Sequence, residues 1–242
     1  MNELDLDKID GLAELFNVKR VESFYRFLYE KNDEGGFFSK GDFDRIGDRH
    51  VVECMAYIRR IMSLKNVSRE TKILDVGSGP GLPGFLFACL NQPPYVTLLD
   101  SSKRRLSLVE KYWQQTVSDA ENPAKNNRLK FVYQRAEEYK GQFDVVTMRA
   151  LIPFPYNAIL VRHLVKDRIA VLVGESPVSQ ESQKILEDYR LKVVDSECCK
   201  LTELNFLGER NLIIVRKIDR NQTLRPVVWK NLKNEIEIWR KL

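Results

Sequence analysis

The sequence predicts an α/β fold with a seven-stranded, mostly parallel sheet and an N-terminal helical portion. Over residues 1–64, apolar side chains recur at steps of three and four, which is the spacing of amphipathic helices. Over residues 65–219, short apolar runs alternate with helix-length segments. Strands that alternate with helices in this way form parallel sheets, so we expect one sheet-based domain over this range.

Three helices are expected in the N-terminal helical portion. Their apolar faces are Ile9, Leu12 and Phe16; Val21, Phe24 and Leu28; and Val51, Met55, Ile58 and Met62. Gly35, Gly36 and Gly41 interrupt this pattern, which predicts a loop over residues 32–42 between the second and third helices.

Apolar runs mark the seven expected strands, at residues 72–76, 95–99, 129–133, 143–147, 168–173, 191–199 and 211–218. The first five alternate with helical segments and are expected to run parallel. The last two have no helix-length segment between them. We therefore expect them to pair antiparallel at one edge of the sheet.

Residues 220–242 form a basic tail that is predicted to be helical. Between Arg210 and Leu242 there are nine basic and three acidic residues, a net charge of +6, whereas the whole chain carries +5. An apolar stripe at helical spacing follows Pro226, at Trp229, Leu232, Ile236 and Trp239. We expect a helix that docks on the domain and presents lysines to RNA phosphates, although charge alone fits a solvated face equally well.

Composition excludes several classes of protein. Apolar residues make up 43% and charged residues 30% of the chain, which excludes wholesale disorder. The acidic start MNELDLDKIDG and the lack of an apolar run of about 18 residues predict neither a signal peptide nor a membrane span, and hence a cytoplasmic protein. No Cys-x-x-Cys pair occurs among the four cysteines, so we expect neither a metal site nor a disulfide framework.

The run from the first expected strand into GSGPGLPG (77–84) and then an apolar helix is typical of a nucleotide-binding loop. Gly77, Gly79 and Gly81 allow a sharp turn and a close approach of backbone to ligand, although tight turns without a ligand also use glycine. Asp100 ends the second expected strand, 19 residues after Gly81. An acidic side chain there can accept both hydroxyls of a ribose.

NAD and S-adenosylmethionine both contain a ribose, and the loop favours the second. A pyrophosphate needs free N–H donors at the helix start, and Pro80 and Pro83 remove two of them. Asp75 would repel a dianion and attract a sulfonium and an ammonium. The sequence therefore predicts S-adenosylmethionine as the cofactor.

Several motifs carry a resemblance to a known family. LDVGSGPGLPG (74–84), TLLDSSKRR (97–105), RAEE (135–138), MRAL (148–151) and ERNLIIVRK (209–217) resemble the RsmG/GidB family of small-subunit (16S) ribosomal RNA guanine-N7 methyltransferases. The resemblance spans about residues 45–218, and the segment Arg49-His50-Val51-Val52-Glu53 is similar to an arginine–histidine segment of that family. It implies a class I S-adenosylmethionine-dependent methyltransferase (Rossmann-like) fold, with 16S ribosomal RNA or the small ribosomal subunit as partner.

The resemblance also implies roles for individual residues. Gly77 and Leu82 would line the cofactor, Ala136 and Glu137 would flank its adenine, and Arg149 would lie in the cofactor pocket. From the residues alone, Arg149 can clamp the methionine carboxylate or read a guanine, and we favour the carboxylate. Met148 and Val173-Gly174 depart from the family, which has a serine and a lysine–glycine there, so the groups that hold the guanine stay open.

Missing motifs argue against other methyl acceptors. RALIPFPY (149–156) lacks the acidic or amide residue followed by Pro-Pro-aromatic that is typical of amine methylation, and no cysteine lies near that strand end in sequence. Guanine N7 needs neither device, so we expect no catalytic residue and no general base, and we expect His50 and His163 to have packing roles. RNA contacts are expected at Arg59, Arg60 and residues 103–105. The open alternatives are another nucleic acid or a small molecule as substrate, or a non-catalytic RNA-binding or assembly protein.

Overall fold

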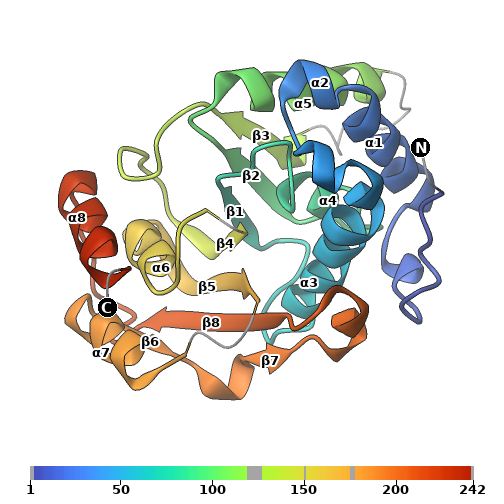
Figure 1. Ribbon diagram of the computed structural model, residues 1–242. Coiled ribbons are helices and arrows are strands. Elements are labelled where there is room, and N and C mark those ends of the chain that lie inside the picture. Colours follow the sequence, from blue (N-terminus) through green and yellow to red (C-terminus); the bar gives the residue numbers. More distant parts are fainter. Residues whose placement is uncertain (1–2, 119–126, 150, 175–177, 241–242) are drawn as a thin grey trace.

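The computed structural model describes residues 3–118, 127–149, 151–174 and 178–240, and it shows one sheet between two layers of helices (Figure 1). In these residues eight strands follow the order β3-β2-β1-β4-β5-β8-β6, with β7 paired to β8. The strands are β1 (Lys72–Val76), β2 (Tyr95–Leu99), β3 (Leu129–Val132), β4 (Phe143–Arg149), β5 (Val165–Val173), β6 (Leu191–Val193), β7 (Cys199–Lys200) and β8 (Asn211–Lys217). Chain order reverses between β1 and β4, which creates a topological switch point where ligands bind in such sheets.

The predicted strands are confirmed, with one change. β1 to β5 pair in parallel, and β8 pairs antiparallel with both β5 and β6. The segment 191–199 is not one strand, because a 3₁₀ turn at Asp195–Glu197 separates β6 from β7. Glu197 leaves the sheet ladder and instead accepts from Arg168, at 2.7 Å, and from Arg216, at 2.8 Å.

The N-terminal helices differ more from the prediction. The expected first helix is wrong: residues 9–16 hold only a 3₁₀ turn at Ala13–Leu15, because Gly11 adopts a left-handed φ of +67°. Its apolar residues are nevertheless buried. α1 (Val18–Glu30) is the second expected helix, and α3 (Glu53–Met62) with the π-helical turn Ile46–Val52 before it is the third.

The segment expected to be a loop, residues 32–42, is only partly one. It holds the short α2 (Asn32–Gly35), and a 3₁₀ turn begins at Lys40. Gly36 ends α2 in the left-handed conformation, which is the usual way in which a glycine stops a helix.

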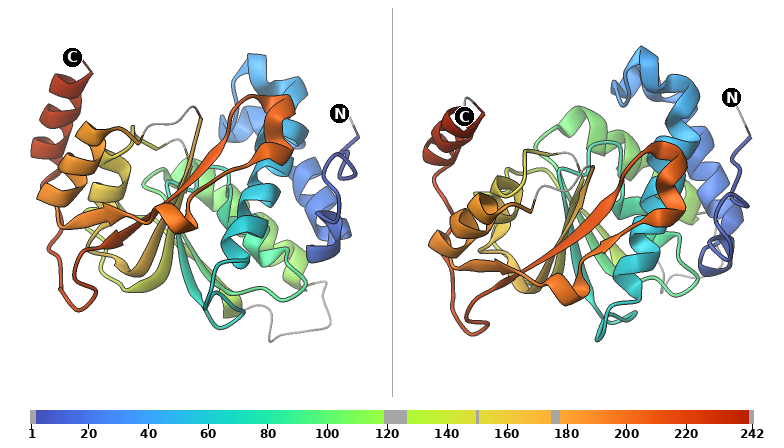
Figure 2. Two further views of the ribbon diagram at one scale, coloured as in Figure 1. Left: turned by 90° about the horizontal axis from the view of Figure 1, so that it is seen from below. Right: turned by 60° about the horizontal axis from the view of Figure 1, so that its bottom comes forward.

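Two apolar cores hold the helices on opposite faces of the sheet (Figure 2). α1, α3, α4 (Gly84–Ala88) and α5 (Lys103–Ser118) cover one face, where Phe24 stacks on Phe85 with ring centroids 3.9 Å apart. α6 (Tyr156–Val161), α7 (Gln180–Asp188) and α8 (Trp229–Trp239) cover the other. The division into portions 1–64, 65–219 and 220–242 stays a prediction.

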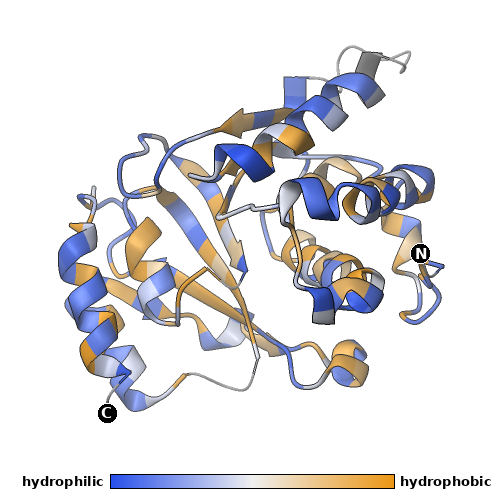
Figure 3. Ribbon diagram, turned by 45° about the horizontal axis from the view of Figure 1, so that its top comes forward, coloured by the Kyte–Doolittle hydropathy of each residue, from blue (hydrophilic) through white to orange (hydrophobic). Residues whose placement is uncertain are grey.

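The predicted C-terminal helix is confirmed as α8 and is docked on the domain. Leu232 and Ile236 are buried in the second core, whereas Lys230 and Lys233 are exposed. Figure 3 shows this mixture of hydrophobic and hydrophilic residues along the helix. Lys241 and Leu242, which belong to the predicted basic tail, lie outside the described residues.

Candidate active site

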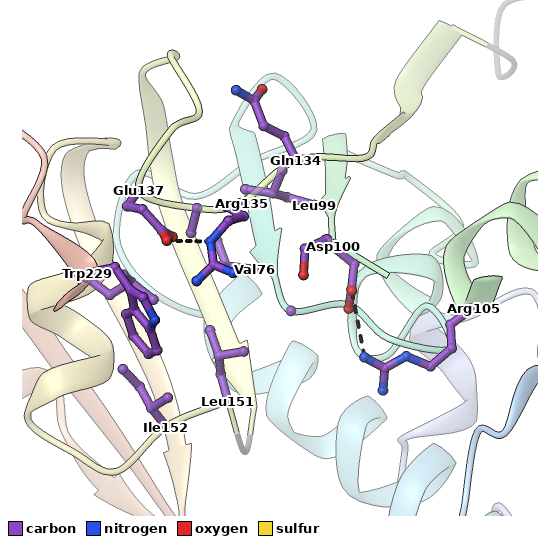
Figure 4. Close-up of a pocket in the computed structure, with 14 residues that line it drawn as sticks. Val76, Leu99, Asp100, Arg105, Gln134, Arg135, Glu137, Leu151, Ile152 and Trp229 are labelled. Atoms are coloured by element: carbon purple, nitrogen blue, oxygen red, sulfur yellow. Dashed lines mark hydrogen bonds and ion pairs between the residues drawn. The ribbon is translucent and has the colours of Figure 1, made fainter. Parts of the chain in front are cut away.

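A cavity of about 400 Å³ opens at the carboxyl ends of β1, β2 and β3 (Figure 4). Its volume is within the range of small-molecule sites, about 300–1,000 Å³. Four of the residues predicted to bind a cofactor line it: Gly77, Asp100, Ala136 and Glu137. The structure therefore brings together the loop after β1, the end of β2 and the turn after β3, which are the places where a parallel sheet binds a nucleotide.

Asp100 holds the glycine loop in place. Its Oδ2 accepts from the backbone N–H of Gly79, at 2.7 Å, and its Oδ1 accepts from that of Ser102, at 2.6 Å. Arg105 lies 3.7 Å from Oδ1. The carboxylate thus fixes the loop and also forms part of the cavity wall, as Figure 4 shows.

Asp75 lies behind the loop and does not line the cavity. It is fully buried, and its Oδ2 accepts from the backbone N–H of Gly84, at 2.9 Å. Burial raises the pKa of this carboxyl from 3.8 to about 7. In this structure Asp75 fastens the start of α4 to β1, so any attraction for a cationic ligand acts from behind the wall.

Three other predicted cofactor residues lie away from this cavity. Leu82 is almost fully buried in the first core, and a Cβ on Gly81 would lie 3.0 Å from Val109. Gly79 also lies outside the cavity lining, where an added Cβ would lie 3.6 Å from Arg105. These residues shape and support the loop in the structure.

Gly77→Ala and Gly79→Ala form a matched pair that tests this assignment. Both glycines have a left-handed φ, +73° and +52°, so both variants carry similar backbone strain. At Gly77 the new methyl group would lie 2.6 Å from Leu151 Cδ1. Leu151 lines the cavity, so its displacement by the methyl group would change the shape of the cavity. We expect Gly77→Ala to weaken binding of S-adenosylhomocysteine about 10-fold or more beyond Gly79→Ala, measured by calorimetry. Equal losses in the two variants would contradict this placement.

Trp229 contributes a wall that the sequence reasoning missed. It was predicted only as part of the packing stripe of α8, yet it lines the cavity opposite Asp100 in Figure 4. The guanidinium of Arg135 lies 5.6 Å from the centre of its ring and also pairs with Glu137, at 2.6 Å. α8 is therefore part of the site.

A second cavity, of about 410 Å³, lies beside the first at the carboxyl ends of β4 and β5. Ile152 lines both cavities, and so places them next to each other. Arg149 lines this second cavity rather than the first. Its Nε donates to Glu53 Oε2, at 2.8 Å, and its Nη2 donates to the backbone oxygen of Arg49, at 2.8 Å.

Glu53 joins three segments at the second cavity. Only 3% of its side chain is exposed, and its two carboxylate oxygens pair with Arg149 and Arg210. In the sequence, Glu53 stands out only as part of the arginine–histidine segment, and Arg210 only as a basic residue of the tail. The available signal was an acidic residue on the apolar face of a helix, between Val52 and Cys54.

Neither a histidine nor a cysteine at this place has the properties of a catalytic group. Burial, with Arg149 nearby, lowers the pKa of His50 to about 3, and its Nδ1 lies 2.7 Å from Arg149 Nη2. The neutral ring thus accepts a hydrogen bond and positions the arginine. Folding brings Cys54 beside Arg149, but burial raises the pKa of its thiol to about 12 and it is fully buried.

The arginines expected to contact RNA are engaged within the protein. Arg59 pairs with Glu203, at 2.9 Å, Arg60 donates to Cys199 Sγ, at 3.1 Å, and Arg104 donates to the backbone oxygen of Glu34, at 2.9 Å. Lys103 is exposed. RNA contact at these positions stays a prediction.

The family model for rRNA small subunit methyltransferase G (GidB) matches residues 17–207. The chain belongs to this family. A ribosomal RNA small subunit methyltransferase G from Leptospira biflexa is 37% identical over 222 residues, covering 91% of this chain and 88% of the relative. One from Leptospira interrogans is 35% identical over 229 residues, covering 93% and 86%.

The fold of this GidB family member is that of S-adenosylmethionine-dependent methyltransferases, as predicted. A magnesium protoporphyrin IX methyltransferase from Synechocystis PCC 6803, solved with bound S-adenosylhomocysteine, matches with a TM-score of 0.51 and 14% identity. The match covers 80% of this chain and 99% of that structure.

The residues of the first cavity fit S-adenosylmethionine. Gly77 lines the cavity with backbone alone, the Asp100 carboxylate lies at the wall, and Trp229 and Leu99 offer apolar surface. In the described part of the chain, no helix has the length and apolar character needed to cross a membrane. The described residues also contain no group of three or more side chains placed to hold a metal ion.

Proposed function

We propose that this GidB family member transfers a methyl group from S-adenosylmethionine to N7 of a guanine in the 16S RNA of the small ribosomal subunit, in the cytoplasm. Family membership over residues 17–207, joined to a nucleotide-sized cavity at the switch point, is the observation that carries the proposal. Bound S-adenosylmethionine supplies the electrophilic methyl group.

The chain's own task is to bind and align. The N7 lone pair lies in the plane of the guanine ring and carries no proton, so the reaction needs no general base. His50, which is hydrogen-bonded to Arg149, and the fully buried Cys54 lie behind the lining of the second cavity. Gly77, Asp100, Ala136 and Glu137 would hold the cofactor in the first cavity. The adjacent second cavity, with Arg149 and Arg210, is where the acceptor would lie.

Transfer of tritium from labelled S-adenosylmethionine tests the proposal. Naked 16S RNA and small subunits, each prepared from cells that lack the enzyme, are offered in parallel, and digestion to nucleosides identifies the product. We expect 7-methylguanosine. A different methylated nucleoside would overturn the N7 acceptor, and binding of RNA without any transfer would favour a non-catalytic assembly protein.

A further inference from the structure

Helix α8 places one tryptophan at each of the two cavities. Trp229, in its first turn, lines the first cavity, and Trp239, in its last turn, lines the second. Leu232 and Ile236 between them are buried in the core, which fixes the helix against α6. The Trp239 ring meets that of Tyr156 edge-on, with centroids 6.0 Å apart. This helix lies beyond the matched residues 17–207.

The second cavity combines a cationic side with an apolar side. Arg149 and Arg210 share the single carboxylate of Glu53, which leaves an excess of positive charge, whereas Arg49 pairs with Asp42, at 2.6 Å. The apolar side is formed by Phe154, Leu172 and Trp239. Cations beside an aromatic surface are the combination that binds an unstacked nucleotide, because the cations attract the phosphate and the ring stacks on the base.

We propose that the second cavity binds the acceptor guanine nucleotide and that Trp239 is the surface on which its base stacks. The inference deepens the proposed function and rests on it. An arginine that bound O6 and N7 of the guanine would cover the atom to be methylated. Stacking holds the base by its face and leaves the ring edge free. Trp239 thereby becomes a residue that determines binding of the acceptor, supplied by the C-terminal helix.

Trp239→Leu and Trp239→Phe test this role, with Ile238→Ala as the matched control. Leucine and phenylalanine both keep an apolar contact with Tyr156, but only phenylalanine keeps a ring. Ile238 is the neighbouring residue on α8 and is 64% exposed. For each variant we would measure the Kd for a 16S RNA fragment at about 200 mM salt, where phosphate contacts are weakened. We would also measure KM and kcat with small subunits, and the Kd for S-adenosylhomocysteine.

Loss of stacking is expected to weaken the binding of RNA selectively. Because base–aromatic stacking contributes to the binding of an unstacked base, Trp239→Leu should raise the RNA Kd and KM about 10-fold, with kcat changed less than about 3-fold. The Kd for S-adenosylhomocysteine should stay unchanged. Trp239→Phe should remain within about 3-fold of the natural protein in every measurement. The control variant Ile238→Ala should give the same values as the natural protein.

Three results would overturn the inference: an unchanged RNA Kd in Trp239→Leu, an equal loss in Trp239→Phe, or a parallel loss of S-adenosylhomocysteine binding. The natural protein, measured in the same assay, separates this failure from that of the proposed function. If it transfers no methyl group to RNA, the proposed function fails. If it is active and Trp239→Leu equals it, only the role of Trp239 fails.

Discussion

Glu53→Gln is expected to lower the free energy of unfolding by about 3 kcal/mol. Only 3% of the Glu53 side chain is exposed, and its carboxylate pairs with both Arg149 and Arg210. Breaking a buried ion pair by removing one partner costs about 3–5 kcal/mol, because the remaining charges stay buried without compensation. Urea denaturation at pH 7, followed by circular dichroism, measures the loss.

Glu203→Gln is the matched control for this prediction. Glu203 pairs with Arg59 at 2.9 Å, but the two side chains are 27% and 29% exposed, so solvent screens the pair. We expect a loss of less than about 1 kcal/mol there. If the two variants lose the same stability, the burial of Glu53 does not make its ion pairs stronger than an exposed pair.

Asp75→Asn is expected to change how stability depends on pH. Burial raises the pKa of this carboxyl to about 7 in the folded chain, against 3.8 for the ordinary group. The folded state therefore holds the proton more tightly than the unfolded state, and the stability that this group contributes at low pH is lost as the pH rises through about 7. Between pH 5 and pH 8 the natural protein should lose about 3 kcal/mol relative to the variant, which cannot titrate.

Denaturation of both proteins at several pH values checks the sign as well as the size. Parallel stability curves for Asp75→Asn and the natural protein would show that Asp75 is ionised throughout.

The cofactor side of the site was predictable because its signals are local. A strand, a glycine loop and an acidic residue at the next strand end lie within 72–100, and alternation of apolar runs gave the sheet. The expected helix over residues 9–16 failed for an equally local reason, since Gly11 takes a left-handed φ of +67° and turns the chain. Ile9, Leu12 and Phe16 are buried at the spacing that is typical of a helix, although the segment is not an α-helix.

The acceptor side was not predictable, because it is built from contacts between distant residues. Glu53 meets Arg149 across 96 residues and Arg210 across 157 residues of chain. In the sequence, Trp229 and Trp239 belong to one apolar stripe. Helical spacing predicts that this face of the helix is buried, but not whether it packs on the protein core or lines a cavity. Arg149 lies at the predicted strand end, but its ion pair with Glu53 directs its side chain to the second cavity.

The shared carboxylate of Glu53 affects how the chain folds during its synthesis. A chain leaves the ribosome with its N-terminus first, so α3 emerges with its glutamate while the cations that will neutralise it are still unmade. Arg149 follows 96 residues later, and Arg210 follows 157 residues later. A nascent fragment that stops before Arg149 therefore leaves the Glu53 carboxylate without a cationic partner, and one that stops between Arg149 and Arg210 lacks the second ion pair, which ties α3 to the residue just before β8.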